Sequence, residues 1–206
     1  PEKYGNCMGG TYFRFAERTR RATDGADMAE GADGPTGRRA HGPPSPTYLQ
    51  ALPCDPMLLR DFFEPTGLAL PLRATLAEDV LSEMVGLLQL DERGSEGVLK
   101  ILRRREELGS TGVGRGIAIP HGRTLVTPRV RLAYGHASDG IAWRAVDDRP
   151  VHHFFLIIAP PVEVNNQYLQ VLSKVAAFAK EADVPGRLAK VNTPEEFFAL
   201  LEEKGA

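Results

Sequence analysis

The 206-residue sequence predicts an α/β domain of three layers, in which helices cover both faces of a mixed β-sheet. Helical and extended patterns alternate along the chain from Met57 onward. The extended stretch at residues 154–158 is apolar at every position, which is typical of a strand buried on both faces. Residues 1–56 lack these patterns. We therefore expect one folded domain, residues 57–206, preceded by a segment of a different kind.

The N-terminal segment, residues 1–56, is rich in glycine and proline and has few apolar residues. Such a composition does not offset the entropy lost on folding, so we expect a disordered, low-complexity segment. Its basic clusters at residues 18–21 and 38–39 leave a basic docking arm as the alternative. Regular patterning starts at Met57, so a native start there, with translated upstream sequence before it, is a hypothesis. N-terminal sequencing of the native protein that found an earlier residue would refute it.

Charge and composition argue against several classes of partner. The chain has 25 basic and 27 acidic residues, so nothing indicates a nucleic-acid or anionic membrane surface. The apolar run at residues 154–159 is far shorter than the roughly 20 residues of a membrane span, so no membrane insertion is expected. No secretory signal is visible, and Cys7 and Cys54 do not make a disulfide framework. We expect a cytoplasmic protein.

The folded part opens with three patterns. Residues 58–63 are a short amphipathic stretch, and residues 68–72 read as an edge strand that Pro71 interrupts. Residues 75–78, with the sequence TLAE, form a capping box, which predicts a helix that ends near Leu90.

A second helix is predicted from Ser95 to Leu108, and Gly109 is expected to end it in the left-handed conformation. Arg103, Arg104 and Arg105 lie in its last turns. They complement the helix dipole, and one of them is placed to reach an anion held by the loop that follows.

The second half of the domain has strand patterns at residues 130–135 and 151–159. Between them lie a predicted turn at residues 139–140, a short apolar segment at residues 141–143 and another turn at residues 147–150. Trp143 is expected to be a core residue.

The last helices have their own start signals. Asn165 or Asn166 is predicted to cap one helix, and Pro185 to open a short helical turn. Residues 193–196, with the sequence TPEE, form a second capping box before the last helix.

The most informative stretch is residues 109–123, where a glycine-rich loop leads into a short apolar strand. Pro120 ends the strand, His121 follows it, and Gly122 and Arg123 come next. A histidine on a rigid edge, beside free backbone N–H groups and a cation, suits contact with an anion. A plain tight turn with a surface histidine is the alternative reading.

Two nucleotide-binding motifs fail in this loop. Gly109 and Gly114 have the P-loop spacing, but Arg115 and Gly116 replace the required lysine and hydroxyl residue. The dinucleotide fingerprint requires a third glycine at Ile117, and here a helix precedes the loop, which reverses the context of both motifs.

Residues 105–114 (REELGSTGVG) and 116–122 (GIAIPHG) closely resemble the fructose/mannitol-type (type 2) enzyme IIA domain of the bacterial phosphotransferase system, with the nitrogen-regulatory branch the nearest. The resemblance covers Met57 to about Glu203. It implies a cytoplasmic phosphocarrier that accepts a phosphoryl group on His121 from an HPr-type protein, with a phosphohistidine intermediate. The family arginine falls on Arg105, which would clamp the phosphoryl oxygens.

The chemistry of these residues is consistent with that function, because neutral imidazole is a nucleophile near neutral pH and phosphoryl transfer depends mainly on positioning and charge. Ser110, Thr111 and the loop N–H groups, including those of Gly112 and Gly114, are expected to complete the anion site. No metal, nucleotide or other cofactor is required.

The resemblance breaks at Tyr168, where many family members have a second histidine. A tyrosine hydroxyl still hydrogen-bonds to imidazole or phosphate, so Tyr168 is expected to support the site. The change counts against onward transfer to a sugar-transport domain and favours a regulatory protein that signals by phosphorylation-dependent binding, with a transporter or sensor kinase as possible target. Two alternatives stay open: a sugar-specific enzyme IIA that serves a membrane permease, and a binding module that is never phosphorylated.

The other histidines do not suggest a metal site. His152 and His153 are adjacent on a predicted strand, so they point to opposite faces. His136 is expected to follow a strand as a surface residue, with a place near His121 left open. No zinc-ligand spacing links these residues to His121.

Overall fold

The computed structural model describes residues 57–162, 164–165 and 167–206, and the residues from Met57 to Ala206 form one compact unit. The predictions for residues 1–56, and the alternative of Asn166 as a helix cap, lie outside the described residues. None of the helices in the described ranges has the length and apolar character needed to cross a bilayer.

Within the described residues, a mixed sheet of six strands forms the centre of the domain. The strand order is β1-β5-β6-β3-β2, and β4 pairs with β6 beyond the end of β3. Strands β1 and β5 are parallel, as are β6 with β3 and β6 with β4, whereas β5–β6 and β2–β3 are antiparallel. The strands are β1 (Phe63–Ala69), β2 (Gly112–Gly114), β3 (Ile117–Ala118), β4 (His121–Arg123), β5 (Arg131–Ile141) and β6 (Val151–Ala159).

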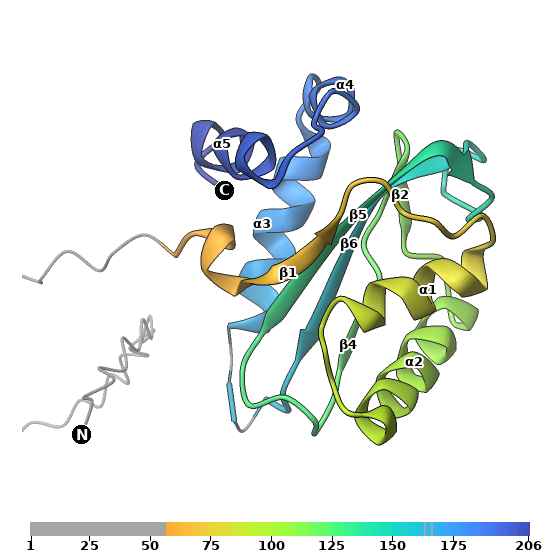
Figure 1. Cartoon of the computed structure of the whole chain (residues 1–206), viewed down its shortest axis with the longest axis vertical. Helices are drawn as coiled ribbons and strands as arrows, with labels where there is room; N and C mark the ends of the chain where they lie inside the picture. The colour runs from red at the N-terminus through yellow and green to blue at the C-terminus, as the bar shows by residue number, and fades with distance from the viewer. Residues whose placement is uncertain (1–56, 163, 166) are drawn as a thin grey trace, which may run out of the picture. The chain divides into compact units, whose positions relative to one another are not determined.

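Helices cover both faces of this sheet, which confirms the predicted three-layer α/β fold (Figure 1). One face carries the first two helices, and the other carries the last three together with a 3-10 turn, η1. They are η1 (Leu59–Phe62), α1 (Ala77–Gly86), α2 (Glu92–Glu107), α3 (Tyr168–Lys180), α4 (Val184–Leu188) and α5 (Pro194–Glu203).

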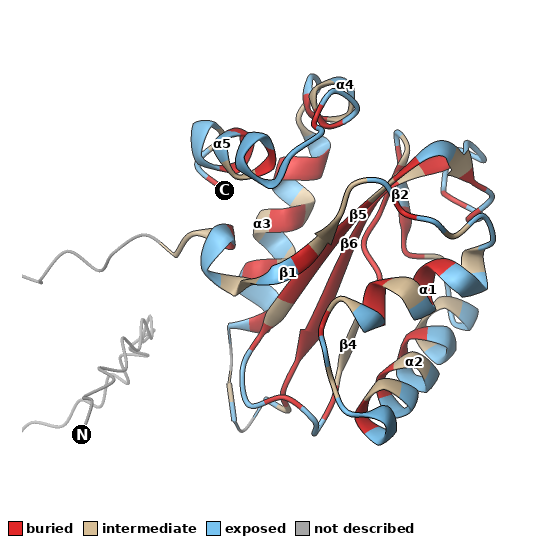
Figure 2. Cartoon of the chain, in the orientation of Figure 1, coloured by how far each residue is buried: buried red, intermediate tan, exposed pale blue. Residues whose placement is uncertain are grey.

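Strand β6 separates two apolar cores, as the fully apolar pattern predicted. Phe155 and Ile157 pack toward α3 and α5, while Phe154 and Leu156 pack toward α1 and α2. Figure 2 shows β5 and β6 buried between the two helical layers. At about 25 cal/mol per Å² of apolar surface, burial of such side chains is the main stabilising contribution to the domain.

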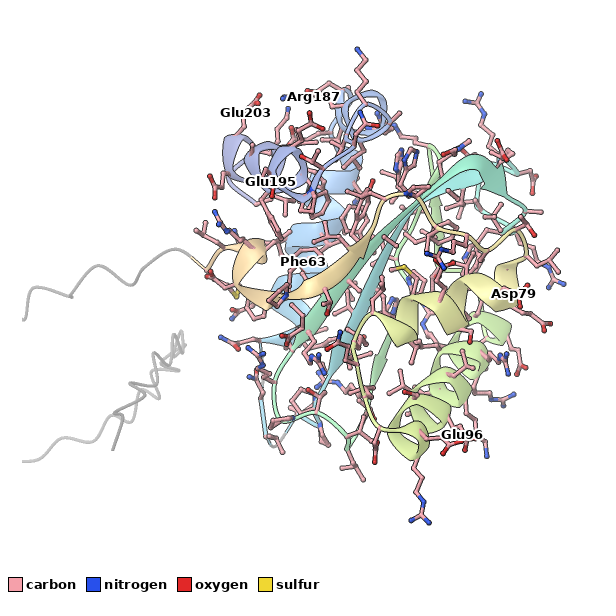
Figure 3. The ribbon with its side chains drawn as sticks, viewed as in Figure 1. Phe63, Asp79, Glu96, Arg187, Glu195 and Glu203 are labelled. Atoms are coloured by element: carbon pink, nitrogen blue, oxygen red, sulfur yellow. The ribbon has the colours of Figure 1, made fainter. Side chains whose placement is uncertain are left out.

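The β1 edge closes against the last helix. Phe63, at the start of β1, makes an edge-to-face contact with Phe197 of α5, with ring centroids 5.4 Å apart. Arg187 of α4 and Glu203 of α5 form an exposed ion pair, and Figure 3 shows both at the outer side of this layer. The edge strand was predicted, but at residues 68–72; it spans Phe63–Ala69 and ends before Pro71.

The predicted capping box at Thr75 is wrong. Helix α1 begins at Ala77, and its N-cap, Leu76, makes no side-chain cap bond. The Glu83 carboxylate instead accepts the backbone N–H groups of Arg73 and Ala74 at 2.8–3.0 Å. These bonds hold the incoming chain extended, so the helix starts later than predicted, and it ends at Gly86 rather than near Leu90.

Helix α2 differs from its prediction at both ends. Asp91 caps it by accepting the backbone N–H of Gly94 at 2.9 Å, so it begins at Glu92 and not at Ser95. Gly109 is not among the described residues with positive φ, so it does not end the helix in the left-handed conformation. The Arg105 guanidinium donates to the Gly109 carbonyl instead, at 2.6 Å.

The residues of the predicted turn, Asp139 and Gly140, lie within a strand. Strand β5 continues to Ile141, with a register shift between His136 and Ile141, and Gly140 has a φ of 75°. The glycine thus supplies the left-handed residue of a bulge and does not end the strand.

Near the C-terminus, β6 has the predicted bounds and Thr193 makes the predicted capping box with Glu196. Asn165 does not cap α3: its side chain accepts the backbone N–H of Gln167 at 2.7 Å in the turn before the helix, and Gln167 is the N-cap.

Candidate functional site

The sheet places His121 at its edge. Among the described residues, strand β4 pairs with β6 alone, and His121 lies beside Ile157 in that parallel pair. Ile157 points toward α3, and neighbours in register share a face, so the His121 side chain also points to the α3 side. Pro120 separates β3 from β4, and its carbonyl accepts the N–H of Ile157 at 2.9 Å. The backbone on either side of His121 is therefore fixed.

Gly122 allows α2 to approach on the other face. A Cβ atom at Gly122 would lie 2.8 Å from Cγ2 of Ile101. Absence of a side chain there lets α2 pack directly over β4. This packing brings the last turn of α2, and with it Arg105, to the His121 ring.

Two hydrogen bonds orient the His121 imidazole. Nδ1 lies 2.7 Å from the carbonyl oxygen of Ile119, and Nε2 lies 3.2 Å from Nε of Arg105. A carbonyl only accepts and a guanidinium only donates, so Nδ1 carries the proton and Nε2 presents its lone pair. The network thereby assigns the tautomer in which Nε2 is the nucleophilic nitrogen.

The environment favours the neutral ring. Burial lowers the pKa of His121 below its usual 6.5, and the positive charge of Arg105 lowers it further. The hydrogen bond to Ile119 and the charge of Glu106 act in the opposite direction without reversing the shift.

Arg105 is the arginine that the structure brings to His121. Its Nη1 donates to the Gly109 carbonyl while its Nε donates to the imidazole, so the guanidinium bridges loop and ring. Arg104, one residue earlier, pairs with Glu107 on the exposed face of α2.

Tyr168, the first residue of α3, lies beside His121 on the α3 side of the sheet. The two ring centroids are 6.3 Å apart, and burial raises the pKa of the Tyr168 phenol, which is therefore a neutral donor. The Arg123 guanidinium stacks 4.3 Å from the centre of the Tyr168 ring and donates to the Pro160 carbonyl. Two arginines and a phenol thus lie around His121.

The glycine-rich loop has its polar groups committed to other bonds. Ser110 Oγ donates to the Trp143 carbonyl and accepts the N–H of Gly112, while Gly112 and Gly114 belong to β2. The Thr111 backbone N–H and hydroxyl both bond to the Glu106 carboxylate. The role of these four residues in binding phosphate stays a prediction.

Sequence reasoning did not single out Glu106 as a site residue. Its carboxylate holds Thr111 at 2.6–3.0 Å, and the buried Trp143 indole lies 3.4 Å from the same threonine hydroxyl. Glu106 thus fixes the loop beside Arg105. Its only sequence signal was its place next to that arginine at the end of the helix. Trp143 is a core residue, as predicted.

The other described histidines lie away from His121. His136 is paired with His153 across β5 and β6, four positions along β6 from the partner of His121. The expectation that His136 follows a strand is wrong, since it lies within β5 and is half-buried. Among the residues that the structure describes, no three His, Cys, Asp or Glu side chains are grouped to hold a metal.

Comparison with known proteins identifies the family of the chain. A sequence profile of the family "Phosphoenolpyruvate-dependent sugar phosphotransferase system, EIIA 2" matches residues 61–204. The crystal structure of the nitrogen regulatory protein IIA-Ntr from Neisseria meningitidis superposes with a TM-score of 0.63 at 28% identity, over 68% of this chain and 97% of that one.

Two curated relatives represent different branches. The nitrogen regulatory protein of Pseudomonas aeruginosa is 32% identical over 59% of this chain and 80% of its own length. The 2-O-alpha-mannosyl-D-glycerate-specific EIIABC component of Escherichia coli is 30% identical over 54% of this chain, but the match spans only 17% of that protein. The fold, the matched profile and these similarities agree, and the chain belongs to the EIIA 2 family of the phosphoenolpyruvate-dependent sugar phosphotransferase system.

Proposed function

We propose that the chain is a regulatory phosphocarrier, which accepts a phosphoryl group on His121 from an HPr-type protein and signals through phosphorylation-dependent protein binding. The observation that carries this proposal is the ring orientation. The Ile119 carbonyl at 2.7 Å fixes the proton on Nδ1, and Nε2 faces Arg105 at 3.2 Å.

The donor protein and this chain together account for every bond and electron pair in the transfer step. The Nε2 lone pair of His121 attacks the phosphorus atom of a phosphohistidine on the donor. The donor's N–P bond breaks, and its electron pair returns to the donor's ring nitrogen. His121 becomes a phosphoimidazole that keeps its Nδ1 proton and its bond to Ile119.

The surrounding groups suit the charge that this step moves. Arg105 releases Nε2 and donates to the phosphoryl oxygens, and the Tyr168 hydroxyl is a second donor on the α3 side. Because the transferring group is negative throughout, a guanidinium that the Gly109 carbonyl keeps at this position stabilises it electrostatically.

Exposed apolar side chains near the His121 end of the sheet support signalling by protein binding. Leu125 follows β4, Val162 follows β6 and Leu169 lies in the first turn of α3, and their relative exposures are 87%, 57% and 63%. A phosphoryl group beside such a surface adds about −1.5 to −2 charges, which changes its affinity for a partner.

The test is phosphorylation of the full chain with phosphoenolpyruvate, enzyme I and an HPr-type protein, followed by intact mass. We expect one acid-labile phosphoryl group on the wild type and on His152→Ala, and none on His121→Ala. If the wild type gains no mass while the same donor phosphorylates a control enzyme IIA, the phosphocarrier proposal is wrong, and the unphosphorylated binding module becomes the account of the chain.

A second candidate function is a sugar-specific enzyme IIA, because one matched relative is the mannosylglycerate-specific component. Tyr168, in place of a family histidine, favours the regulatory function, as does the higher TM-score with the nitrogen regulatory protein, 0.63 against 0.54 for mannitol IIA of E. coli. Transfer of phosphate from the loaded chain to an isolated IIB domain would favour the sugar-specific function.

A further inference from the structure

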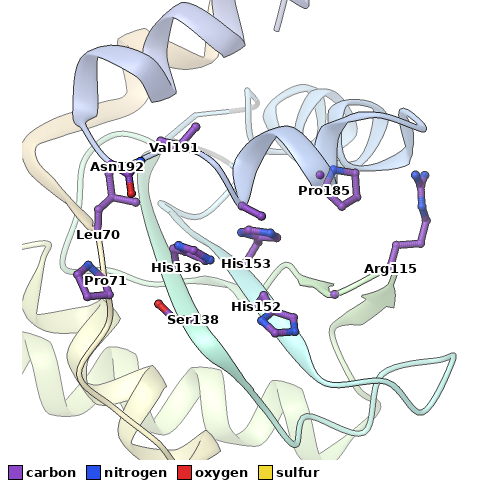
Figure 4. A pocket seen from close by; sticks show the side chains of 13 residues that line it. Leu70, Pro71, Arg115, His136, Ser138, His152, His153, Pro185, Val191 and Asn192 are labelled. Atoms are coloured by element: carbon purple, nitrogen blue, oxygen red, sulfur yellow. The ribbon is translucent and has the colours of Figure 1, made fainter.

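A second group of histidines lies at the opposite end of β6 from His121. His153 is four residues before Ile157, the partner of His121, so the two places are about 13 Å apart along the strand. A pocket of about 600 Å³ opens there, lined by His136, His152 and His153 (Figure 4). That volume is within the usual range for a small-molecule site.

His153 forms the floor of this histidine pocket, and its Nδ1 is engaged in a hydrogen bond. Its Nδ1 lies 2.9 Å from the hydroxyl of Tyr134, whose pKa is raised by burial, so the phenol donates to the ring. Burial is the main reason that the pKa of His153 falls to about 3. The residue is therefore neutral at physiological pH and adds no positive charge to the pocket.

His136 has unused hydrogen-bonding capacity. Its ring stacks on His153 at a centroid distance of 4.9 Å, and no hydrogen bond joins it to any other residue in the described part of the chain. His152, beside it, lies with Nδ1 3.1 Å from the Ala137 carbonyl, which leaves its Nε2 available. Two imidazoles thus present free nitrogens to one cavity.

The charged groups around the pocket are basic. Arg115 lines it, and a groove of about 410 Å³ that shares Arg115 and His152 adds Arg149. Within the described ranges, no Asp or Glu lines either cavity. Asp147 is nearby, but its carboxylate accepts the backbone N–H groups of Arg115 and Arg149 at 2.8 and 3.3 Å.

The two arginines differ in how much they can offer a ligand. The Arg115 guanidinium donates to the carbonyls of Lys180 and Ala182 at 2.7 Å each, which fixes it at the pocket rim. The Arg149 side chain is exposed and, among the described residues, has no side-chain partner. The charged side chains of the pocket and the adjoining groove are all basic, and the guanidinium of Arg149 in the groove is free, which indicates a negatively charged ligand.

The opposite wall is mainly apolar, with the amide of Asn192 beside Val191. Leu70, Pro71 and Val191 face the histidines, and Figure 4 shows Leu70 and Pro71 across the cavity from Pro185. An inorganic ion makes no use of such a wall, whereas an organic anion covers it with carbon. We propose that the histidine pocket is a second ligand site, separate from the His121 site, which binds a small organic anion through its carboxylate or phosphate group.

Binding there draws in a proton. Burial, together with the charge of nearby His152, holds the pKa of His136 below 6.5, so the free ring is neutral at pH 7.5. An anion beside it favours the imidazolium and opposes that shift. The titratable and charged groups that face His136 are His152, His153 and Arg115, with none on the apolar wall.

The test is calorimetric titration of the full chain with succinate and, separately, glycerol 3-phosphate, at pH 7.5 and constant ionic strength. Succinate is fully ionised at this pH, so proton uptake, measured in two buffers of different ionisation enthalpy, reports on the protein. We expect saturable binding of at least one probe, and the probe preferred tells a carboxylate ligand from a phosphate ligand. Net uptake of protons is expected with succinate.

Matched variants locate the site. His136→Gln and the exposed Arg149→Gln are each expected to weaken binding about fivefold or more, while Arg93→Gln, an exposed arginine on α2, leaves it unchanged. His121→Gln is also expected to bind normally, so this result is independent of the phosphocarrier proposal. Absence of saturable binding for both probes, or binding that His121→Gln abolishes and Arg149→Gln does not affect, would overturn the second site.

Discussion

Nε of Arg105 and Nε2 of His121 are 3.2 Å apart, a donor and an acceptor joined across the junction of α2 with β4. One residue comes from the last turn of a helix and the other from the first position of an edge strand. The guanidinium occupies the direction along which a phosphoryl group would arrive in the proposed transfer. It therefore holds the resting ring in place and is positioned to exchange that bond for one to the incoming oxygens.

Removal of this guanidinium should slow phosphorylation strongly. Arg105→Gln is expected to reduce the rate at which His121 is phosphorylated by about 10²-fold, since a preorganised charge is lost from the transferring group. Arg104→Gln, whose side chain pairs with Glu107 on the exposed face, is the control and should stay near the wild-type rate. Rapid-quench measurements with an excess of phosphorylated HPr-type donor give both rates, and equal losses in the two variants would contradict the assignment.

The pH dependence of the site follows from the lowered pKa of His121. Burial comes first among its causes, and the Arg105 charge acts in the same direction. The neutral, nucleophilic ring is therefore present above that pKa, so the rate should be flat from pH 7 to 8 and fall only below pH 6.5. An NMR titration of the His121 ring should show a midpoint below 6.5 that rises in Arg105→Gln; a midpoint at or above 6.5 in the wild type would refute this.

His153 should make the domain sensitive to acid. Its native pKa of about 3 is far below the unfolded value of 6.5, so the unfolded chain binds more protons. The free energy of unfolding is therefore highest above pH 6.5. It falls as the pH drops from 6.5 toward 3, by about 1.4 kcal/mol per pH unit for this one residue.

Urea unfolding at pH 6.5 and pH 5.0 measures this effect. The free energy of unfolding of the wild type should fall by about 2 kcal/mol more than that of His153→Gln over this interval. The comparison uses the change with pH within each variant, so a lower absolute stability of the variant does not affect it. Equal changes in the two proteins would mean that His153 is not held neutral.

Two threonines with the same sequence signal should respond differently to substitution. Thr193→Ala removes a formed capping box, in which the hydroxyl accepts the N–H of Glu196, and should cost about 1 kcal/mol. Thr75→Ala removes an exposed side chain that makes no cap bond, so the change should stay within about 0.5 kcal/mol. Urea unfolding of both variants provides the comparison, and a larger loss for Thr75→Ala would show that α1 begins earlier than Ala77.

Thr75 and Thr193 also illustrate which features could be predicted from the sequence. Patterns that depend on burial were reliable: the apolar run of β6 gave its bounds, because a strand between two helical layers has no polar alternative. Local start signals were less reliable, because near or distant groups can take the same backbone N–H groups. At Thr75 the competitor was Glu83, ten residues from Arg73, and its pairing with that backbone is a tertiary contact that the capping motif does not encode.

The candidate site shows the same division. His121, Arg105 and Tyr168 could be named from the motif, and the structure places them together. The hydrogen bonds from Thr111 to the Glu106 carboxylate could not be predicted. The sequence shows that a glycine-rich loop has backbone N–H groups, but it does not show which acceptor binds them.

The central claim is that the Ile119 carbonyl fixes the His121 ring so that Nε2 receives the phosphoryl group. The most direct test is a long-range ¹H–¹⁵N spectrum of the ring nitrogens, recorded on the full chain before and after phosphorylation. The account predicts a protonated Nδ1 in both states and the nitrogen–phosphorus bond at Nε2 of His121. A phosphoryl group on Nδ1, or on any other residue, would contradict it.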